Sequence, residues 1–169
     1  MQSNTTTQTE MNLMQAFAGE SQANRKYLAF AMQAEKEGYP QAAKLFRAAA
    51  EAETVHALAH LRASGKIGTT EENLKAAIAG ETFEFTDMYP PMIRTAQEEG
   101  HAAARKSFTY ANAVEMQHAA LYQQVLDQME ATKETDYYVC SFCGYTSSDD
   151  APGACPLCGS ARSHFSKTD

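Results

Sequence analysis

Glu53-Thr54-Val55-His56 has the pattern Glu-x-x-His, which occurs again in Glu115-Met116-Gln117-His118. Both stretches lie in long segments rich in Ala, Leu and Phe. Residues three apart on an α-helix project from the same face, so each Glu-x-x-His pair places a carboxylate beside an imidazole. In four-helix bundles that hold two metal ions, two helices each supply such a pair and two others each supply a single Glu. The repeated pair therefore predicts a dimetal site inside a helical bundle.

Apolar periodicity predicts four long helices, over residues 10–37, 41–64, 69–100 and 101–132. A capping-box pattern at Thr69 and Glu72 opens the third helix, and Pro90-Pro91 is expected to kink it. We expect residues 1–9 to form a flexible tail and residues 10–132 to form the bundle. After a short linker, residues 133–169 change to a composition rich in Gly, Ser, Asp, Pro and Cys, which indicates a separate loop-rich module.

Each expected helix carries acidic residues inside its apolar stripe. Glu20 shares a face with Phe17 and Tyr27 on the first helix, while Glu81 and Glu84 lie on the stripe of the third. No Lys or Arg shares these faces. The inward-facing candidates for metal binding are Glu20, Glu53, His56, Glu81, Glu84, Glu115 and His118.

Unpaired buried carboxylates cost many kcal/mol, so bound cations are expected to compensate for them. Mixed carboxylate and imidazole ligands suit iron or manganese, and bridging carboxylates hold two ions about 3.5–4 Å apart. The alternative is a buried hydrogen-bond network without metal. His60, His101 and His164 are expected to lie outside the site, as solvated or hydrogen-bonded side chains.

The chain's 169 residues suit one domain of ordinary size and a small appendage. A net charge of −7 disfavours nucleic acid and anionic membranes as partners. The polar N-terminus lacks the features of a signal peptide, and no apolar run is long enough to span a membrane. We therefore expect a soluble cytoplasmic protein.

All four cysteines lie in two knuckles, Cys140-Ser-Phe-Cys143-Gly144 and Cys155-Pro-Leu-Cys158-Gly159. In a reducing compartment this pattern predicts one tetrahedral four-thiolate metal site rather than disulfides. The spacing alone does not separate iron from structural zinc. A module of about 35 residues is too small for a sufficient apolar core, so the metal is expected to stabilise it.

The chain resembles the rubrerythrin family over almost its whole length. Phe17-Ala-Gly-Glu20-Ser-Gln is similar to that family's first-helix motif, and Glu81-Thr-Phe-Glu84-Phe-Thr-Asp-Met-Tyr89-Pro90 is similar to its third. The Glu-x-x-His pairs match the second and fourth helices. The resemblance implies a mainly α fold, with a ferritin-like four-helix bundle followed by a small metal-stabilised rubredoxin-like β/loop domain.

The resemblance also implies the ligands of a diiron-carboxylate site. One iron would be bound by Glu20, Glu53, Glu84 and Glu115, with His56 able to replace Glu84 in the reduced site. The other iron would be bound by Glu53, Glu81, Glu115 and His118. Tyr27 and Tyr89 match positions whose hydroxyls hold ligand carboxylates by hydrogen bonds. A third iron would be bound by Cys140, Cys143, Cys155 and Cys158, with zinc as a possible substitute.

In this family the diiron site reduces hydrogen peroxide to water. The resemblance therefore implies an oxidoreductase of the NADH peroxidase type that acts against oxidative stress. Electrons would come from a rubredoxin or an NAD(P)H-dependent reductase and pass through the four-thiolate iron. One alternative is a ferroxidase or iron-handling protein. Another is a non-enzymatic zinc-ribbon interaction module on a structural bundle, although this does not explain the inward carboxylates.

The connection between the second and third helices constrains the assembly. Ferritin-like topology runs these helices parallel, so the chain between them must return along the bundle. Residues 64–68 reach about 17 Å, whereas the return path is about 30 Å. We therefore expect a homodimer whose chains exchange helix pairs, although a simple up-down bundle would also permit a short loop. One chain would contribute Glu20, Glu53 and His56, and the other Glu81, Glu84, Glu115 and His118.

Overall fold

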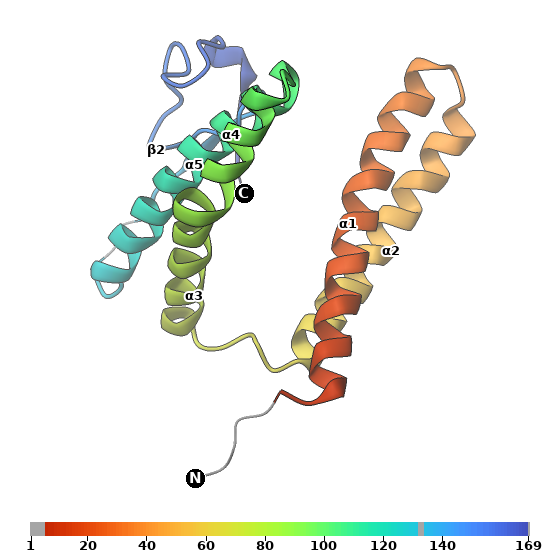
Figure 1. Ribbon diagram of the computed structural model, residues 1–169, viewed down its shortest axis with the longest axis horizontal. Coiled ribbons are helices and arrows are strands. Elements are labelled where there is room, and N and C mark those ends of the chain that lie inside the picture. Colours follow the sequence, from red (N-terminus) through yellow and green to blue (C-terminus); the bar gives the residue numbers. More distant parts are fainter. Residues whose placement is uncertain (1–5, 132–133, 169) are drawn as a thin grey trace. The chain divides into compact units, whose positions relative to one another are not determined.

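The computed structural model describes residues 6–131 and 134–168, and the chain divides into two compact units, Met1–Gly68 and Thr69–Asp169. The predicted mainly helical fold with a small C-terminal module is confirmed (Figure 1). Within the described residues, no helix is both long and apolar enough to cross a membrane.

The first unit is a hairpin of α1 (Gln8–Lys36) and α2 (Pro40–Ala63), which lie side by side in Figure 1. The buried residues of the two helices are all small: Ala31, Ala34, Ala43, Ala50 and Ala57. Asn24 Nδ2 donates hydrogen bonds to Ala50 O at 2.7 Å and to Thr54 Oγ1 at 2.8 Å, which ties the two helices together at mid-length.

The start of α1 differs from the expected tail of residues 1–9. The Thr7 side chain accepts from Glu10 N at 3.2 Å while Glu10 Oε2 accepts from Thr7 N at 2.6 Å, so a capping box starts the helix at Gln8. Residues 1–5 of the expected tail lie outside the described part of the chain.

The second unit begins with α3 (Thr70–Phe83), whose predicted capping box is present. Thr69 Oγ1 accepts from Glu72 N at 3.3 Å, and Glu72 Oε2 accepts from Thr69 N at 2.7 Å. The π-helical segment η1 (Glu84–Met88), α4 (Tyr89–Glu98) and α5 (Ala102–Asp127) follow. Both α3 and α4 pack against α5.

The kink expected at Pro90-Pro91 takes the form of the η1 segment. Both prolines lie in the first turn of α4, where the missing backbone donors are tolerated. Tyr89 N bonds to Glu84 O, one residue further back than in an α-helix, so the widened turn precedes the prolines. The third predicted helix is therefore divided into α3 and α4 by the π-helical turn between Phe83 and Tyr89.

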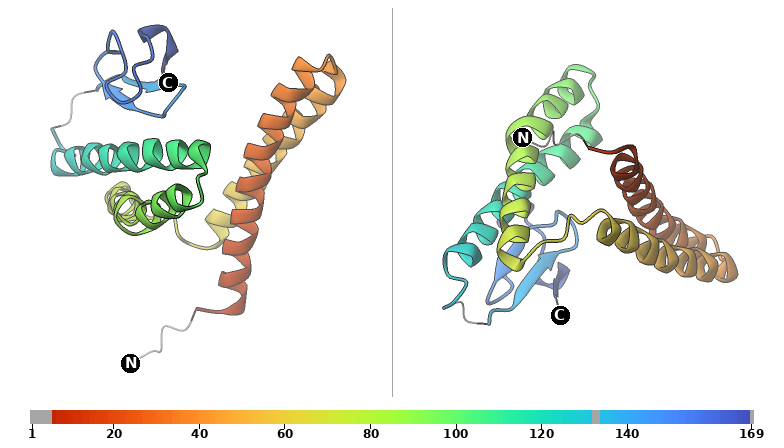
Figure 2. Two further views of the ribbon diagram at one scale, coloured as in Figure 1. Left: turned by 45° about the horizontal axis from the view of Figure 1, so that its top comes forward. Right: turned by 90° about the horizontal axis from the view of Figure 1, so that it is seen from below.

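The last bundle helix ends at Asp127, earlier than the expected residue 132. Gln128 leaves the helical conformation, with φ −119° and ψ 16°. The chain turns there because the C-terminal module lies back against α5 rather than beyond its end (Figure 2).

The module is a three-stranded antiparallel sheet in the order β2-β1-β3, formed by Thr146–Ser148, Tyr137–Cys140 and Phe165–Lys167. The short 3₁₀-helix η2 (Arg162–His164) leads into β3. Val139 pairs with Thr146, and Cys140 pairs with Phe165. The module's buried residues are Cys140, Ala151 and Cys155, so its apolar core is as small as expected.

Candidate metal centres

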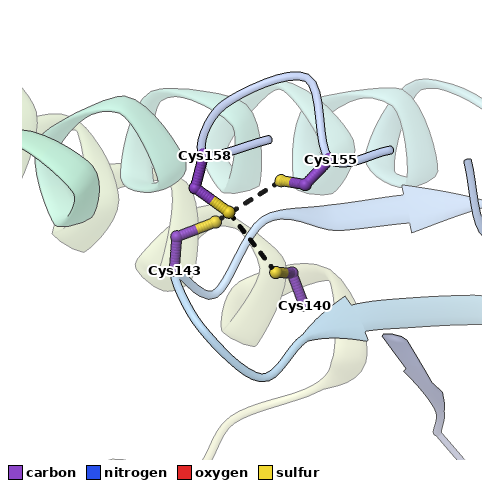
Figure 3. Close-up of side chains that lie close together, drawn as sticks. All are labelled: Cys140, Cys143, Cys155 and Cys158. Atoms are coloured by element: carbon purple, nitrogen blue, oxygen red, sulfur yellow. Dashed lines mark hydrogen bonds between the residues drawn. The ribbon is translucent and has the colours of Figure 1, made fainter. Parts of the chain in front are cut away.

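The four cysteines meet at one point of the C-terminal module (Figure 3). Cys140 Sγ lies 3.8 Å from Cys158 Sγ, and Cys143 Sγ lies 3.6 Å from Cys155 Sγ. A tetrahedron of thiolates bonded at about 2.3 Å to a metal places its sulfurs about 3.8 Å apart. The free thiols therefore have the spacing of a rubredoxin-like four-cysteine site.

The two knuckles share one backbone geometry. Gly144 N donates to Cys140 O, and Gly159 N donates to Cys155 O, each at 2.9 Å. Both glycines have positive φ, +83° and +78°, a conformation that a residue with a side chain adopts only with strain. The glycine after each second cysteine therefore permits the turn that brings each pair of sulfurs together.

The thiols are not equivalent before a metal binds. The Ser160 hydroxyl lies 3.2 Å from Cys158 Sγ, and hydrogen bonding from Ser160 lowers the pKa of Cys158 to about 6. Burial raises the pKa of Cys143. Cys158 thus ionises more readily than Cys143, and a bound cation would favour the thiolate form of its ligands.

One carboxylate and imidazole cluster lies on the first unit, where Glu20 of α1 meets Glu53 and His56 of α2. His56 Nδ1 lies 2.8 Å from Glu53 Oε2. The hydrogen bonds to His56 and Glu20 lower the pKa of Glu53. The His56 side chain is 55% exposed, whereas that of Glu53 is 18% exposed.

The second cluster lies on the other unit and repeats this geometry with Glu81 of α3 and with Glu115 and His118 of α5. His118 Nδ1 lies 3.0 Å from Glu115 Oε2 and 3.8 Å from Glu81 Oε1. Burial, followed by the charge of Glu115, raises the pKa of Glu81. These carboxylates repel one another, so a bound cation would relieve the repulsion.

Glu84 begins the η1 segment, three residues after Glu81. It does not belong to the close cluster, but burial and the charge of Glu81 raise its pKa. Tyr89 lies at the other end of η1, and its pKa is raised by burial and by the charges of Glu84, Glu115 and Glu81. The charges of three expected ligand carboxylates therefore act on the Tyr89 phenol.

The expected ligands are only partly covered within their own units. Among the described residues, no charged or polar residue is fully buried. Tyr27 contacts the rings of Phe30 and Phe46, with centroids 6.3 and 6.2 Å away.

His101 lies outside the clusters, as expected, and its Nδ1 accepts from Ala104 N at 3.2 Å to cap α5.

Two residues that the sequence patterns did not single out connect the module to the second cluster. Thr146 Oγ1 lies 3.0 Å from His118 Nε2, and Thr146 N donates to Gln117 Oε1 at 3.2 Å. The Gln117 amide also donates to Thr146 O. Gln117 lies within the Glu-x-x-His motif and Thr146 follows a knuckle, but only their packing reveals the contact.

The donor sets fit the metals that the motifs predict. Each cluster combines carboxylate oxygens with one imidazole, which suits iron or manganese, and four thiolates suit iron or zinc. Each of the two units thus carries one group of candidate residues for diiron binding, and the second unit also carries a four-cysteine rubredoxin-like site.

Two family models match the chain. One described as Rubrerythrin matches residues 11–126, and one described as "Rubrerythrin, rubredoxin-like domain" matches residues 138–166. The first contains every predicted ligand of the helical clusters, and the second contains all four cysteines. The first match therefore falls on the predicted helical bundle, and the second falls on the predicted four-cysteine module.

Relatives match over nearly the whole chain. Rubrerythrin of Porphyromonas gingivalis is 40% identical, with 93% of this chain and 88% of the relative aligned. Nigerythrin of Nitratidesulfovibrio vulgaris is 35% identical, with 91% and 83% aligned. Among solved structures, the fully reduced, all-ferrous state of nigerythrin is 33% identical with a TM-score of 0.59, covering 99% of this chain and 90% of that one.

Proposed function

The chain belongs to the rubrerythrin family, and we propose that it is a non-haem diiron peroxidase that reduces hydrogen peroxide to water. One observation carries the proposal: a single chain combines two matching carboxylate and imidazole clusters with a four-thiolate site. A storage or ferroxidase site has no need of a separate one-electron centre, so the combination favours peroxide reduction over iron handling.

Two irons held by the clusters would supply the two electrons that, together with two protons from the solvent, convert hydrogen peroxide into two waters. The proposed ligands of one iron are Glu20, Glu53, Glu84 and Glu115, with His56 able to replace Glu84. The proposed ligands of the other are Glu53, Glu81, Glu115 and His118. The contacts of His56 with Glu53 and of His118 with Glu115 support this assignment, because each imidazole already faces the carboxylate with which it would share a metal.

The tyrosines would act on the ligand carboxylates. The Tyr89 phenol is protonated at neutral pH, and burial and the nearby carboxylate charges raise its pKa further. The hydroxyl can therefore donate a hydrogen bond to a neighbouring carboxylate. Such hydrogen bonds orient metal ligands and tune their basicity. We assign the equivalent role in the first unit to Tyr27.

Electrons would enter through iron in the four-cysteine site, from a rubredoxin or an NAD(P)H-dependent reductase. Support for this relay comes from the contact between the module and α5. The Thr146 hydroxyl donates to the carbonyl of Gly144, the residue after Cys143, at 3.2 Å and also contacts His118. A short path of covalent and hydrogen bonds thus runs from a thiolate ligand to a proposed diiron ligand.

We also propose a homodimer in which each diiron site uses the first cluster of one chain and the second cluster of its partner. The support is the short connection between α2, which ends at Ala63, and α3, which begins at Thr70. Ferritin-like topology requires a return path along the bundle that this connection does not reach within one chain.

The proposal is tested by loading the full-length protein with iron, reducing it anaerobically and adding hydrogen peroxide while both iron chromophores are observed. We expect the diiron site to oxidise first and the four-thiolate iron to follow by internal electron transfer. Persistence of a reduced thiolate centre beside an oxidised diiron site would contradict the relay. Failure of the diiron site to react with peroxide would contradict the peroxidase assignment.

A matched pair of substitutions on α3 distinguishes the loss of a metal ligand from the general effect of removing a negative charge. Glu81→Gln removes a proposed ligand, and we expect peroxide turnover to fall by about 100-fold or more. Glu71→Gln makes the same chemical change at an exposed residue paired with Lys75. This control should keep wild-type turnover, and equal losses in both variants would contradict the ligand assignment.

A further inference from the structure

We propose that Thr146 is a positioning residue for His118: its hydroxyl holds the imidazole in the Nε2–H tautomer and leaves Nδ1 free to bind a metal ion. This inference rests on the proposed metal site, and it assigns to the C-terminal module a role besides electron entry. The module would complete the orientation of a ligand in the helical bundle of the same chain.

The hydroxyl group of Thr146 lies between two partners. It donates to Gly144 O at 3.2 Å, and it lies 3.0 Å from His118 Nε2. A hydroxyl has a single proton but two lone pairs. Because Gly144 O can only accept and takes that proton, the contact with His118 requires Nε2–H to donate to Thr146 Oγ1.

The other ring nitrogen of His118 faces acceptors. Nδ1 lies 3.0 Å from Glu115 Oε2 and 3.8 Å from Glu81 Oε1. In the Nε2–H tautomer, Nδ1 carries a lone pair directed toward these carboxylates. A cation among the three groups would convert this repulsion into shared coordination, since neutral imidazole and carboxylate oxygens are both metal ligands.

The opposite tautomer would place its proton on Nδ1, where it would donate to Glu115. Thr146 would then have to donate to Nε2 and lose its bond to Gly144 O. In this arrangement the ring nitrogen facing the carboxylates has no lone pair for a metal. The two tautomers therefore differ both in the partner of the Thr146 proton and in the capacity of His118 to bind metal.

Thr146 is itself held in place by the backbone and by α5. It pairs with Val139 in the sheet, while its peptide exchanges two hydrogen bonds with the Gln117 side chain. The adjoining turn also packs on α5, because a Cβ placed on Gly144 would meet Val114 Cγ1 at 3.8 Å. Gln117, the residue before His118, thus holds the backbone of Thr146 in place. This favours a stable contact between the Thr146 hydroxyl and the His118 ring.

The test uses full-length protein loaded with Zn²⁺, a diamagnetic metal that accepts these ligands, and ¹H–¹⁵N NMR of the histidine rings. In the wild type we expect His118 to show a protonated Nε2 whose proton exchanges slowly with water. Thr146→Val keeps the branched shape but removes the hydroxyl. This change should speed exchange and weaken Zn²⁺ binding at the bundle site by about 10- to 100-fold.

Two further variants separate the hydroxyl's role from strand packing. Thr146→Ser retains the hydroxyl and should restore slow exchange and Zn²⁺ affinity. Ser147→Ala is the matched control, because Ser147 Oγ is buried and has no hydrogen-bond partner among the described residues. It should behave as the wild type, and an effect equal to that of Thr146→Val would overturn the proposal.

The proposal is also overturned if wild-type His118 is protonated at Nδ1, or if Thr146→Val leaves both exchange and Zn²⁺ affinity unchanged. These readouts do not depend on peroxide turnover. An inactive protein with the expected His118 signals would contradict the peroxidase assignment alone. An active protein without them would contradict only the role of Thr146.

Discussion

At the scale of single residues, the two Glu-x-x-His pairs have similar local geometry, but the carboxylates of the two clusters differ in their electrostatic surroundings. The Nδ1 to Oε2 distances are 2.8 Å for His56 and Glu53 and 3.0 Å for His118 and Glu115. Hydrogen bonds lower the pKa of Glu53, whereas burial raises the pKa of Glu81. Glu81 therefore holds its negative charge less readily than Glu53 does in the metal-free protein.

This difference predicts how the metal-free protein responds to pH. A carboxyl whose pKa is raised by folding binds its proton more tightly in the folded state, so stability rises as pH falls toward the ordinary value of 4.5. Because the pKa values of Glu81 and Glu84 are raised, we expect the Tm of the metal-free protein to increase as the pH falls from 7 to 5. Thermal unfolding followed by circular dichroism measures this change.

Glu81→Gln removes one of the titrating groups and should reduce the gain in Tm between pH 7 and pH 5. Glu71→Gln is the control, because Glu71 is exposed. Carboxyls with lowered pKa values, such as Glu53 and Glu72, lose their stabilising charge only below pH 4.5 and act outside this window. An unchanged gain in Glu81→Gln would show that the raised pKa does not arise at this residue.

At the scale of elements, the turn between α1 and α2 depends on the backbone of one residue. Gly38 has a φ of +80°, and a Cβ placed on it would meet no atom within 4 Å. The strain of an added side chain is therefore purely conformational. We expect Gly38→Ala to lower the free energy of unfolding by about 1–2 kcal/mol, measured by urea denaturation.

Gly38→Asn is the matched control for this prediction. Asn adopts positive φ more readily than Ala because its side chain can bond to the local backbone. The loss in Gly38→Asn should therefore be smaller. Equal losses would indicate that an added side chain meets a steric obstacle at this turn rather than backbone strain.

The π-helical segment is the element that the sequence described least well. Pro90-Pro91 indicated a kink, but the backbone changes register before the prolines, within Glu84–Met88. Thr86 Oγ1 donates to Thr82 O at 2.7 Å and so supports a carbonyl of the preceding turn. The local sequence signals an interruption, whereas the packing of α3 and α4 on α5 determines its form.

At the scale of the whole molecule, the proposed exchange of helix pairs makes a prediction that distinguishes shared from single-chain sites. Glu53→Gln disables the first cluster and Glu115→Gln disables the second. In a mixed dimer with exchanged pairs, one site receives both damaged clusters and the other receives both intact ones. Co-refolding equal amounts of the two variants should therefore restore peroxide turnover to about a quarter of the sites.

Each variant refolded alone is the control and should remain inactive. If each site forms within one chain, every site in the mixture contains one damaged cluster, and mixing should restore nothing. Measuring turnover before and after co-refolding, at the same protein concentration, separates these two outcomes.

Much of the fold and the site follows from local patterns. The capping box at Thr69 and Glu72, the two i, i+3 pairs and the paired cysteine knuckles each depend on residues a few positions apart. Such spacing fixes geometry directly through the helix repeat or a tight turn. The sequence therefore determined the helical fold, the members of both clusters and the four-cysteine site.

The contact between the module and α5 is not predicted by any local pattern of residues. His118 and Thr146 are 28 positions apart, and Gln117 and Thr146 are 29 apart. No periodicity links such residues, because their contact depends on how the sheet packs against a helix. Local sequence patterns thus predict which side chains are candidates for binding metal, whereas the packing of the module on α5 places a threonine hydroxyl 3.0 Å from one of them.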